Sequence, residues 1–81
     1  MRIVGEVPHP ELKITLLSWN NRYLVKFEQG YLEQTYKIDQ FDVSGDEAVK
    51  LILDTTFLDS VSQRFRAMDQ DWSEAIRRAD A

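Results

Sequence analysis

The sequence predicts an α+β fold: an antiparallel meander of three or four strands, followed by two C-terminal helices that pack on one sheet face. Two observations indicate this fold class. From Glu11 to Ile38, apolar and polar residues alternate in three successive segments separated by short turns. From Gly45 onward, apolar residues recur at steps of three or four, which is the spacing of a helix with one buried side.

A first strand is expected over residues 2–7. Ile3, Gly5 and Val7 alternate there with other residues, and we place all three on one side of the strand. Pro8-His9-Pro10 follows, and proline cannot donate a ladder hydrogen bond, so this segment is expected to form a connector or a kink. We expect this strand to lie at an edge of the sheet. The sequence does not indicate which strand pairs with it.

The next two strands, residues 11–19 and 22–28, form a hairpin around Asn20-Asn21. Asparagine tolerates the left-handed backbone that two-residue hairpin turns require. This turn places Leu16 opposite Val25, and a slip of one residue would scatter the apolar side chains over both faces. One face then collects the apolar residues Leu12, Ile14, Leu16, Tyr23, Val25 and Phe27.

A last strand is expected over residues 31–38, after a turn centred on Gln29-Gly30. In this register Phe27 faces Leu32, and Lys26 faces Glu33 in a favourable charge pair. Gln34 falls on the apolar side, so its amide is expected to have hydrogen-bond partners or to lie near an edge.

The helical half begins with a helix over residues 45–53. Ser44 is predicted to cap it, with Glu47 completing a capping box. Asp54-Thr55-Thr56 then offers a break and a fresh cap, and a second helix is expected over residues 56–78, with a kink near Gln70 as an alternative. One continuous helix from Gly45 is the competing interpretation.

The second helix carries an apolar stripe whose first half is expected to pack on the sheet. Its residues from Thr56 to Arg78 would span about 34 Å, and a nine-residue strand covers only about 30 Å. Trp72 and Ile76 are therefore predicted to extend past the sheet and to contact another chain. The stripe consists of Phe57, Val61, Phe65, Met68, Trp72 and Ile76.

The chain of 81 residues is expected to form one domain, residues 1–81. It has no cysteine, and no N-terminal apolar run resembles a signal peptide or a membrane span, so we expect a cytoplasmic protein that does not bind a membrane. The net charge of −4 arises entirely after residue 41. An acidic helical half repels phosphate backbones, which disfavours nucleic acid as a partner.

No group of residues suggests chemistry. His9 is the only histidine and is flanked by prolines, and no serine lies in a recognisable nucleophile elbow. The carboxylates of Asp39, Asp42 and Asp46 precede a helix, where the helix dipole accounts for them. No glycine-rich phosphate loop is present. We therefore expect no catalytic activity, no metal site and no cofactor.

The outer sheet face offers the clearest candidate site. Leu17 faces Leu24 there, and Trp19 and Tyr31 point the same way, so an apolar patch with a tryptophan is expected to bind another protein. The leading hypothesis is a non-enzymatic protein–protein interaction or accessory module, homo-oligomeric, with Trp72 and Ile76 as a second contact. The alternative is a domain that binds a small ligand or single-stranded nucleic acid, on the open sheet face or in a cavity between helix and sheet.

The run Leu-Glu-Gln-Thr-Tyr-Lys at residues 32–37, after the Asn-Asn hairpin, resembles small uncharacterised bacterial protein families. The resemblance covers the meander and the early helices. Such families carry no assigned activity, so the resemblance implies no mechanism.

Overall fold

A computed structural model describes residues 1–80. It confirms the predicted fold class, an antiparallel meander followed by two helices. Most element boundaries lie within two residues of those expected from the sequence. The elements are β1 (Arg2–Val7), β2 (Lys13–Trp19), β3 (Arg22–Gln29), β4 (Leu32–Asp39), the 3-10 turn η1 (Gln40–Asp42), α1 (Asp46–Ile52) and α2 (Thr55–Asp80).

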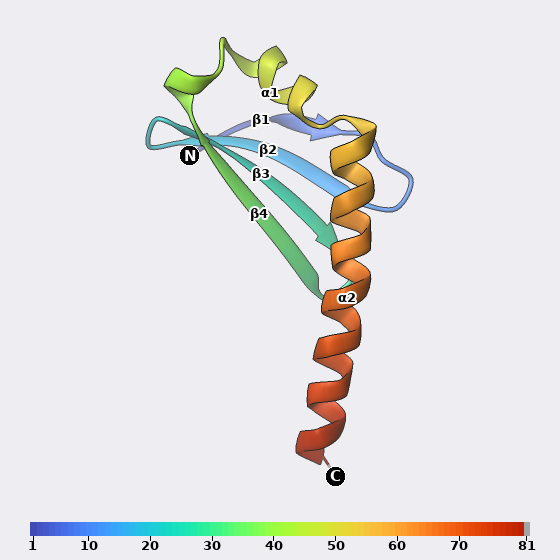
Figure 1. The fold of residues 1–81 in the computed structure, drawn as a ribbon. Coiled ribbons are helices and arrows are strands. Elements are labelled where there is room, and N and C mark those ends of the chain that lie inside the picture. The colour runs from blue at the N-terminus through green and yellow to red at the C-terminus, as the bar shows by residue number, and fades with distance from the viewer. Residues whose placement is uncertain (81) are drawn as a thin grey trace.

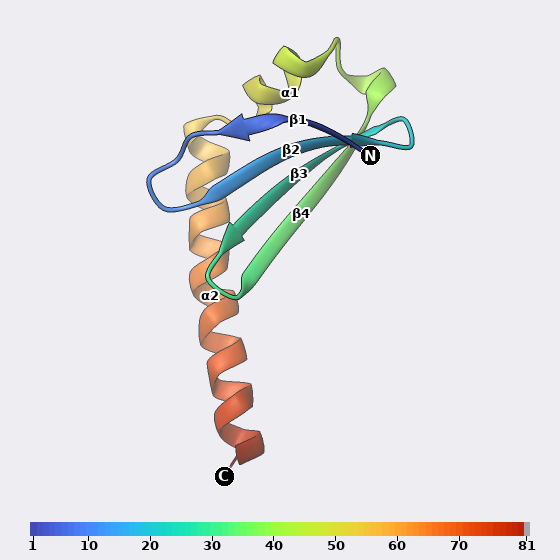
Figure 2. The ribbon, with the colours of Figure 1, turned by 180° about the vertical axis from the view of Figure 1, so that it is seen from behind.

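The sheet has one layer of helix on one of its faces. The strand order is β1-β2-β3-β4, with each neighbouring pair antiparallel, so β1 and β4 are the two edges. Figure 1 shows α2 crossing this sheet and continuing well past it. In Figure 2 the sheet lies in front of α2, so the viewer sees its outer face without a covering element.

The hairpin of β2 and β3 has the predicted register. Leu16 pairs with Val25, and Ile14 pairs with Phe27. Asn20 and Asn21 adopt φ angles of 57° and 63°, the left-handed backbone that this two-residue turn requires. Because the register holds, the apolar residues predicted for the inner face lie toward the helices, while Leu17 and Leu24 lie on the outer face.

The register predicted for β3 and β4 is wrong by two residues. Phe27 pairs with Gln34 instead of Leu32, and the turn is Gly30-Tyr31 instead of Gln29-Gly30. Gly30 has φ of 60°, so the glycine takes the first central position of the turn, as in type II′ hairpins. A shift of two residues keeps every side chain on its predicted face.

The pairing of Lys26 changes with that shift. Lys26 lies opposite Thr35, so its predicted position opposite Glu33 is wrong. The Nζ atom of Lys26 nevertheless lies 3.9 Å from the Oε2 atom of Glu33, on the diagonal, and 3.8 Å from the Oε1 atom of Glu28. Lys26 and Glu33 therefore still form an ion pair, but between diagonal positions of the two strands.

β1 contains a bulge at Val4 that the sequence did not predict. Ile3 pairs with Leu17, while Gly5 pairs with Leu16, so one extra residue lies between the two pairs. The bulge moves Ile3 to the outer face, whereas Gly5 and Val7 stay on the inner face. The prediction that Ile3 shares a side with the other two residues is therefore wrong.

The helix starts are partly as predicted. Ser44 does not cap α1, because Gly45 is the N-cap residue and no side-chain hydrogen bond caps the helix. Asp54 does separate the two helices, and its Oδ1 atom accepts a hydrogen bond from the backbone N–H of Phe57 at 2.8 Å. The α2 helix then runs through Gln70 without interruption, so no second helix start interrupts it.

The core lies between the inner sheet face and the two helices. Phe27, Tyr36 and Phe57 pack edge to face with ring centroids 5.2–5.9 Å apart. Both helices contribute to the core, α2 through its first half. The buried apolar residues are Leu12, Ile14, Leu16, Tyr23, Val25, Phe27, Val49, Leu53, Val61 and Phe65.

Gln34 is the one buried polar side chain in the described residues, and it connects β4 to α2. Its Nε2 atom donates to the carbonyl of Val61 at 3.0 Å, and its Oε1 atom accepts from the Tyr36 hydroxyl at 2.7 Å. Arg64 in turn donates to that hydroxyl at 3.4 Å. The amide is therefore satisfied, as predicted, and it fixes where α2 crosses the sheet.

Replacing Gln34 by alanine should lower the free energy of unfolding by about 1–3 kcal/mol, because buried partners lose their hydrogen bonds. Gln63→Ala is the matched control, since Gln63 is exposed on α2, and it should change stability by less than about 0.5 kcal/mol. Urea unfolding followed by circular dichroism measures both. Equal effects of the two substitutions would contradict the role of Gln34.

Candidate functional site

The outer sheet face carries an apolar row across three strands. Ile3 pairs with Leu17, and Leu17 pairs with Leu24, so the three side chains lie next to one another on β1, β2 and β3. Trp19 lies two residues beyond Leu17 on the same face. Ile3 is 72% exposed and Trp19 is 50% exposed. These four residues are named the outer patch below.

Tyr31 is not brought together with the other predicted surface residues. It lies in the turn between β3 and β4, whereas Trp19 adjoins the Asn20-Asn21 turn at the opposite end of the sheet. Tyr31 is fully exposed. Its place in the patch is taken by Ile3, whose position depends on the Val4 bulge.

The end of α2 extends past the sheet, as predicted for Trp72 and Ile76. Trp72 is 55% exposed and Ile76 is 50% exposed, although both continue the buried stripe of Val61 and Phe65. Trp72 also lines a shallow groove between the helix and the start of β4, together with Leu32, Met68 and Asp71. This part of the stripe lacks a cover within the described residues.

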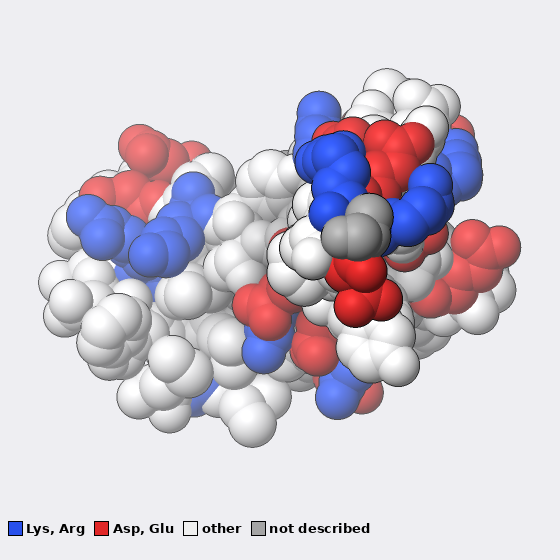
Figure 3. Space-filling view, turned by 90° about the horizontal axis from the view of Figure 1, so that it is seen from below, with Lys and Arg blue, Asp and Glu red and all other residues white. Residues whose placement is uncertain are grey.

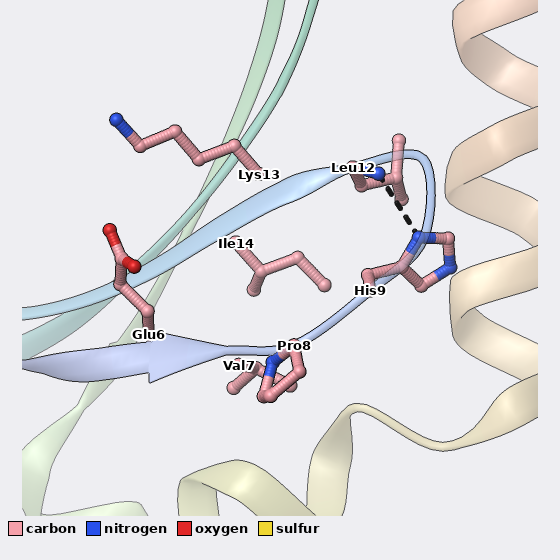
Figure 4. A pocket seen from close by; sticks show the side chains of 7 residues that line it. All are labelled: Glu6, Val7, Pro8, His9, Leu12, Lys13 and Ile14. Atoms are coloured by element: carbon pink, nitrogen blue, oxygen red, sulfur yellow. Dashed lines mark hydrogen bonds between the residues drawn. The ribbon is translucent and has the colours of Figure 1, made fainter.

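His9 closes the loop between β1 and β2. Its Nδ1 atom accepts hydrogen bonds from the backbone N–H groups of Glu11 and Leu12, both at 3.1 Å. These two hydrogen bonds hold the ring against the backbone of its own loop. Figure 4 shows His9 at one end of a hollow and Glu6, the only carboxylate that lines it, at the other end.

The carboxylates predicted near the first helix have separate roles. Asp39 accepts a hydrogen bond from the backbone N–H of Phe41 at 3.0 Å and so caps η1. Asp46 accepts from the Tyr23 hydroxyl at 2.6 Å and lies 3.6 Å from the guanidinium of Arg2. No group of three or more potential metal ligands occurs in the part of the chain that the structure describes.

The Tyr23–Asp46 hydrogen bond links the start of α1 to the sheet and shifts both pKa values. It is the main cause that lowers the pKa of Asp46 below its ordinary value of 3.8, and the charge of Arg2 lowers it further. The same hydrogen bond raises the pKa of Tyr23 above its ordinary value of 10.0. Both shifts favour the pair with a charged carboxylate and a neutral phenol.

A small apolar cavity lies between β4 and the junction of the two helices. Ile38, Leu53 and Phe57 are among the residues that line it, and its volume is about 200 Å³. Sites for small organic ligands usually measure about 300–1,000 Å³ and contain placed polar groups. This cavity is below that range.

Charges of both signs alternate at the free end of the molecule. Figure 3 looks along α2 from its C-terminal end and shows blue and red side chains next to one another on that face. Arg77 and Arg78 lie in the last turn of the helix, and Asp69, Asp71 and Glu74 lie in the preceding turns. None of the helices in residues 1–80 combines the length and apolar composition that a bilayer crossing requires.

Comparison of the chain with protein-family models, with curated proteins and with solved structures finds no match. The resemblance of residues 32–37 to uncharacterised bacterial families gains no support from these comparisons.

Several exposed apolar residues were not predicted from the sequence: Met1, Ile3, Phe41, Leu51 and Ile52. Ile3 reaches the outer patch only through the bulge, and a period of two cannot reveal an inserted residue. Phe41, in η1, is 87% exposed. The signal for Phe41 was available, because a large aromatic residue stands between Gln40 and Asp42 outside both periodic patterns.

The Tyr23–Asp46 pair predicts how stability depends on pH. Because the folded pKa of Asp46 lies below 3.8, its contribution is complete above 3.8 and is lost as the pH falls through the folded pKa. Because the folded pKa of Tyr23 lies above 10.0, its contribution is complete below 10.0 and is lost as the pH rises through the folded pKa.

Asp46→Asn should therefore be less stable than the wild type at neutral pH, and the difference should shrink as the pH falls below 3.8. Urea unfolding at a series of pH values measures the difference. The control is Asp69→Asn, which removes an exposed carboxylate of α2 and should keep the pH dependence of the wild type. A gap between Asp46→Asn and the wild type that stays constant with pH would refute the assignment.

Proposed function

We propose that the chain is a cytoplasmic, non-enzymatic module that binds another protein through its outer patch. The observation that supports this best is the row Ile3–Leu17–Leu24 with Trp19 beside it, on the sheet face that no element of residues 1–80 covers. Contiguous exposed apolar surface on a small domain is typical of protein contact sites. Tryptophan is also enriched among the residues that dominate binding energy.

The surroundings of the patch fit a protein partner better than a nucleic acid. Lys26 and Lys37 lie on this face, but Glu28 and Glu33 lie among them, and both contact Lys26. A groove that binds single-stranded nucleic acid needs a row of positively charged side chains that follows the phosphate backbone of the nucleic acid. The aromatic ring of Tyr31, which could extend a stacking surface, lies at the far end of the sheet.

A ligand site between helix and sheet has less support. The 200 Å³ cavity near Ile38 and Phe57 is almost entirely apolar, and the buried amide of Gln34 is already engaged with Val61 and Tyr36. A small-molecule site normally presents a few free polar groups that orient the ligand. We therefore propose the outer patch, and not a site between helix and sheet, as the binding surface.

The double variant Trp19→Ser, Leu24→Ser tests this proposal in a pull-down from the native cells. We expect a protein that the wild type retains to be lost with the double variant, because both apolar side chains leave the contact. The control is Thr15→Ser, which changes a polar residue of the same face and should retain that protein. If all three baits retain the same proteins, the outer patch is not the binding surface.

A further inference from the structure

The free edge of β4 is unusually regular. β4 is the last strand of the sheet, and both ribbon views show open space beside it on the side away from β3. Its eight residues contain neither glycine nor proline, and its pairing with β3 has no bulge. The other edge, β1, has the Val4 bulge, and Pro8 follows it. Edge strands that remain flat and long are templates for pairing with another chain.

The backbone groups of β4 that face this edge can be assigned. Gln29 and Leu32 flank the two-residue turn, so this pair exchanges hydrogen bonds, and every second pair after it does the same. The hydrogen bond from Gln40 N–H to the Asn21 carbonyl, 2.9 Å, continues that alternation. The N–H and C=O groups of Glu33, Thr35, Lys37 and Asp39 therefore point away from β3.

We infer that β4 pairs with β4 of a second copy of this chain, antiparallel, with Thr35 opposite Thr35 of the second copy. In this register Glu33, Thr35 and Lys37 of each strand form hydrogen-bonded pairs, while Asp39 lies opposite Tyr31 of the turn. Glu33 lies opposite Lys37 of the second copy, and the two-fold axis repeats this pair. The two sheets then form one continuous sheet, and neither β4 remains an edge.

Charge selects this register among those that keep the same groups facing the partner. A two-fold axis through Glu33 or through Lys37 places like charges directly opposite each other, which is destabilising. An axis at Tyr36 places Glu33 opposite Asp39. An axis at Gln34 pairs Glu33 with Thr35 and leaves Lys37 without a carboxylate. An axis at Ile38 also gives two opposite-charge pairs, Lys37 with Asp39, but it pairs only residues 37–39 of β4. The axis at Thr35 gives two opposite-charge pairs and pairs residues 32–38.

The same arrangement accounts for apolar residues that the outer patch leaves unexplained. Antiparallel pairing places Leu32 opposite Ile38 of the second copy on the inner face. Trp72 lines the groove beside Leu32, while Phe41 follows Ile38 closely in the chain. The exposed end of α2 in one copy is therefore brought toward η1 of the other. Phe41, Trp72 and Ile76, which are 87%, 55% and 50% exposed, gain an apolar partner surface there.

The dimer contact is a different surface from the outer patch and forms independently of it. The outer patch lies on β1, β2 and the Asn20 end of β3, whereas the dimer contact lies on β4 and the helices. The outer patch is tested by a pull-down and the dimer by sedimentation, so one proposal can fail while the other holds.

Sedimentation velocity over a concentration series, on the full chain, measures the association. The wild type should reach twice the chain mass of 9.5 kDa. Glu33→Lys and Lys37→Glu should each weaken the dimer by about tenfold or more, because each replaces two attractive pairs by two repulsive ones. An equimolar mixture of the two variants should recover the dimer, because the two lysines of one chain then lie opposite the two glutamates of the other.

Thr35→Pro provides a second test that leaves the charges unchanged. The N–H that proline removes points to the free edge, so the ladder to β3 is kept while the dimer is lost. Circular dichroism should confirm that this variant is folded. The control is the Trp19→Ser, Leu24→Ser variant, which should keep the wild-type dimer. A wild type that stays monomeric throughout, single charge variants that associate like the wild type, or loss of the dimer in the outer-patch variant would overturn the inference.

Discussion

The pairing of Leu16 with Val25 is the constraint on which the rest of the structure depends. Successive side chains of a strand point to opposite faces, so one pair assigns a face to every residue of β2 and β3. The inner face becomes apolar enough to bury two helices, and the outer face is left to solvent or to a partner. A shift of one residue would turn the apolar side chains of one strand to the outer face and so expose either Ile14 or Phe27, which are almost completely buried.

A second constraint places the helix on that sheet. The amide of Gln34 donates to the carbonyl of Val61. This hydrogen bond fixes which part of α2 lies against the middle of β4. The 26 residues of α2 span about 39 Å, and the eight residues of β4 span about 26 Å. The excess has to lie beyond the sheet, and Trp72 and Ile76 fall in that part. Helix length, together with one buried hydrogen bond, therefore creates an uncovered apolar surface.

The titratable groups that could suggest chemistry serve local structure instead. His9 accepts two backbone hydrogen bonds in its own loop, Asp39 caps a turn, and Asp46 joins α1 to Tyr23. The surfaces that we propose for binding are the outer patch on one face, and the β4 edge with the end of α2. Both surfaces present apolar groups with charged side chains around them, which is the usual composition of a protein contact.

The sequence by itself determined the faces of β2, β3 and β4 and the need of Gln34 for partners, and it indicated a break at Asp54 with one continuous helix as the alternative. These features depend on period and on cap chemistry, which act over a few residues. The tertiary structure alone decided the Gly30-Tyr31 turn, the Val4 bulge and the separation of Tyr31 from Trp19. A two-residue shift keeps the same faces, so periodicity could not detect the turn. A bulge changes the pairing only through the neighbouring strand, and that strand's position is a property of the whole sheet.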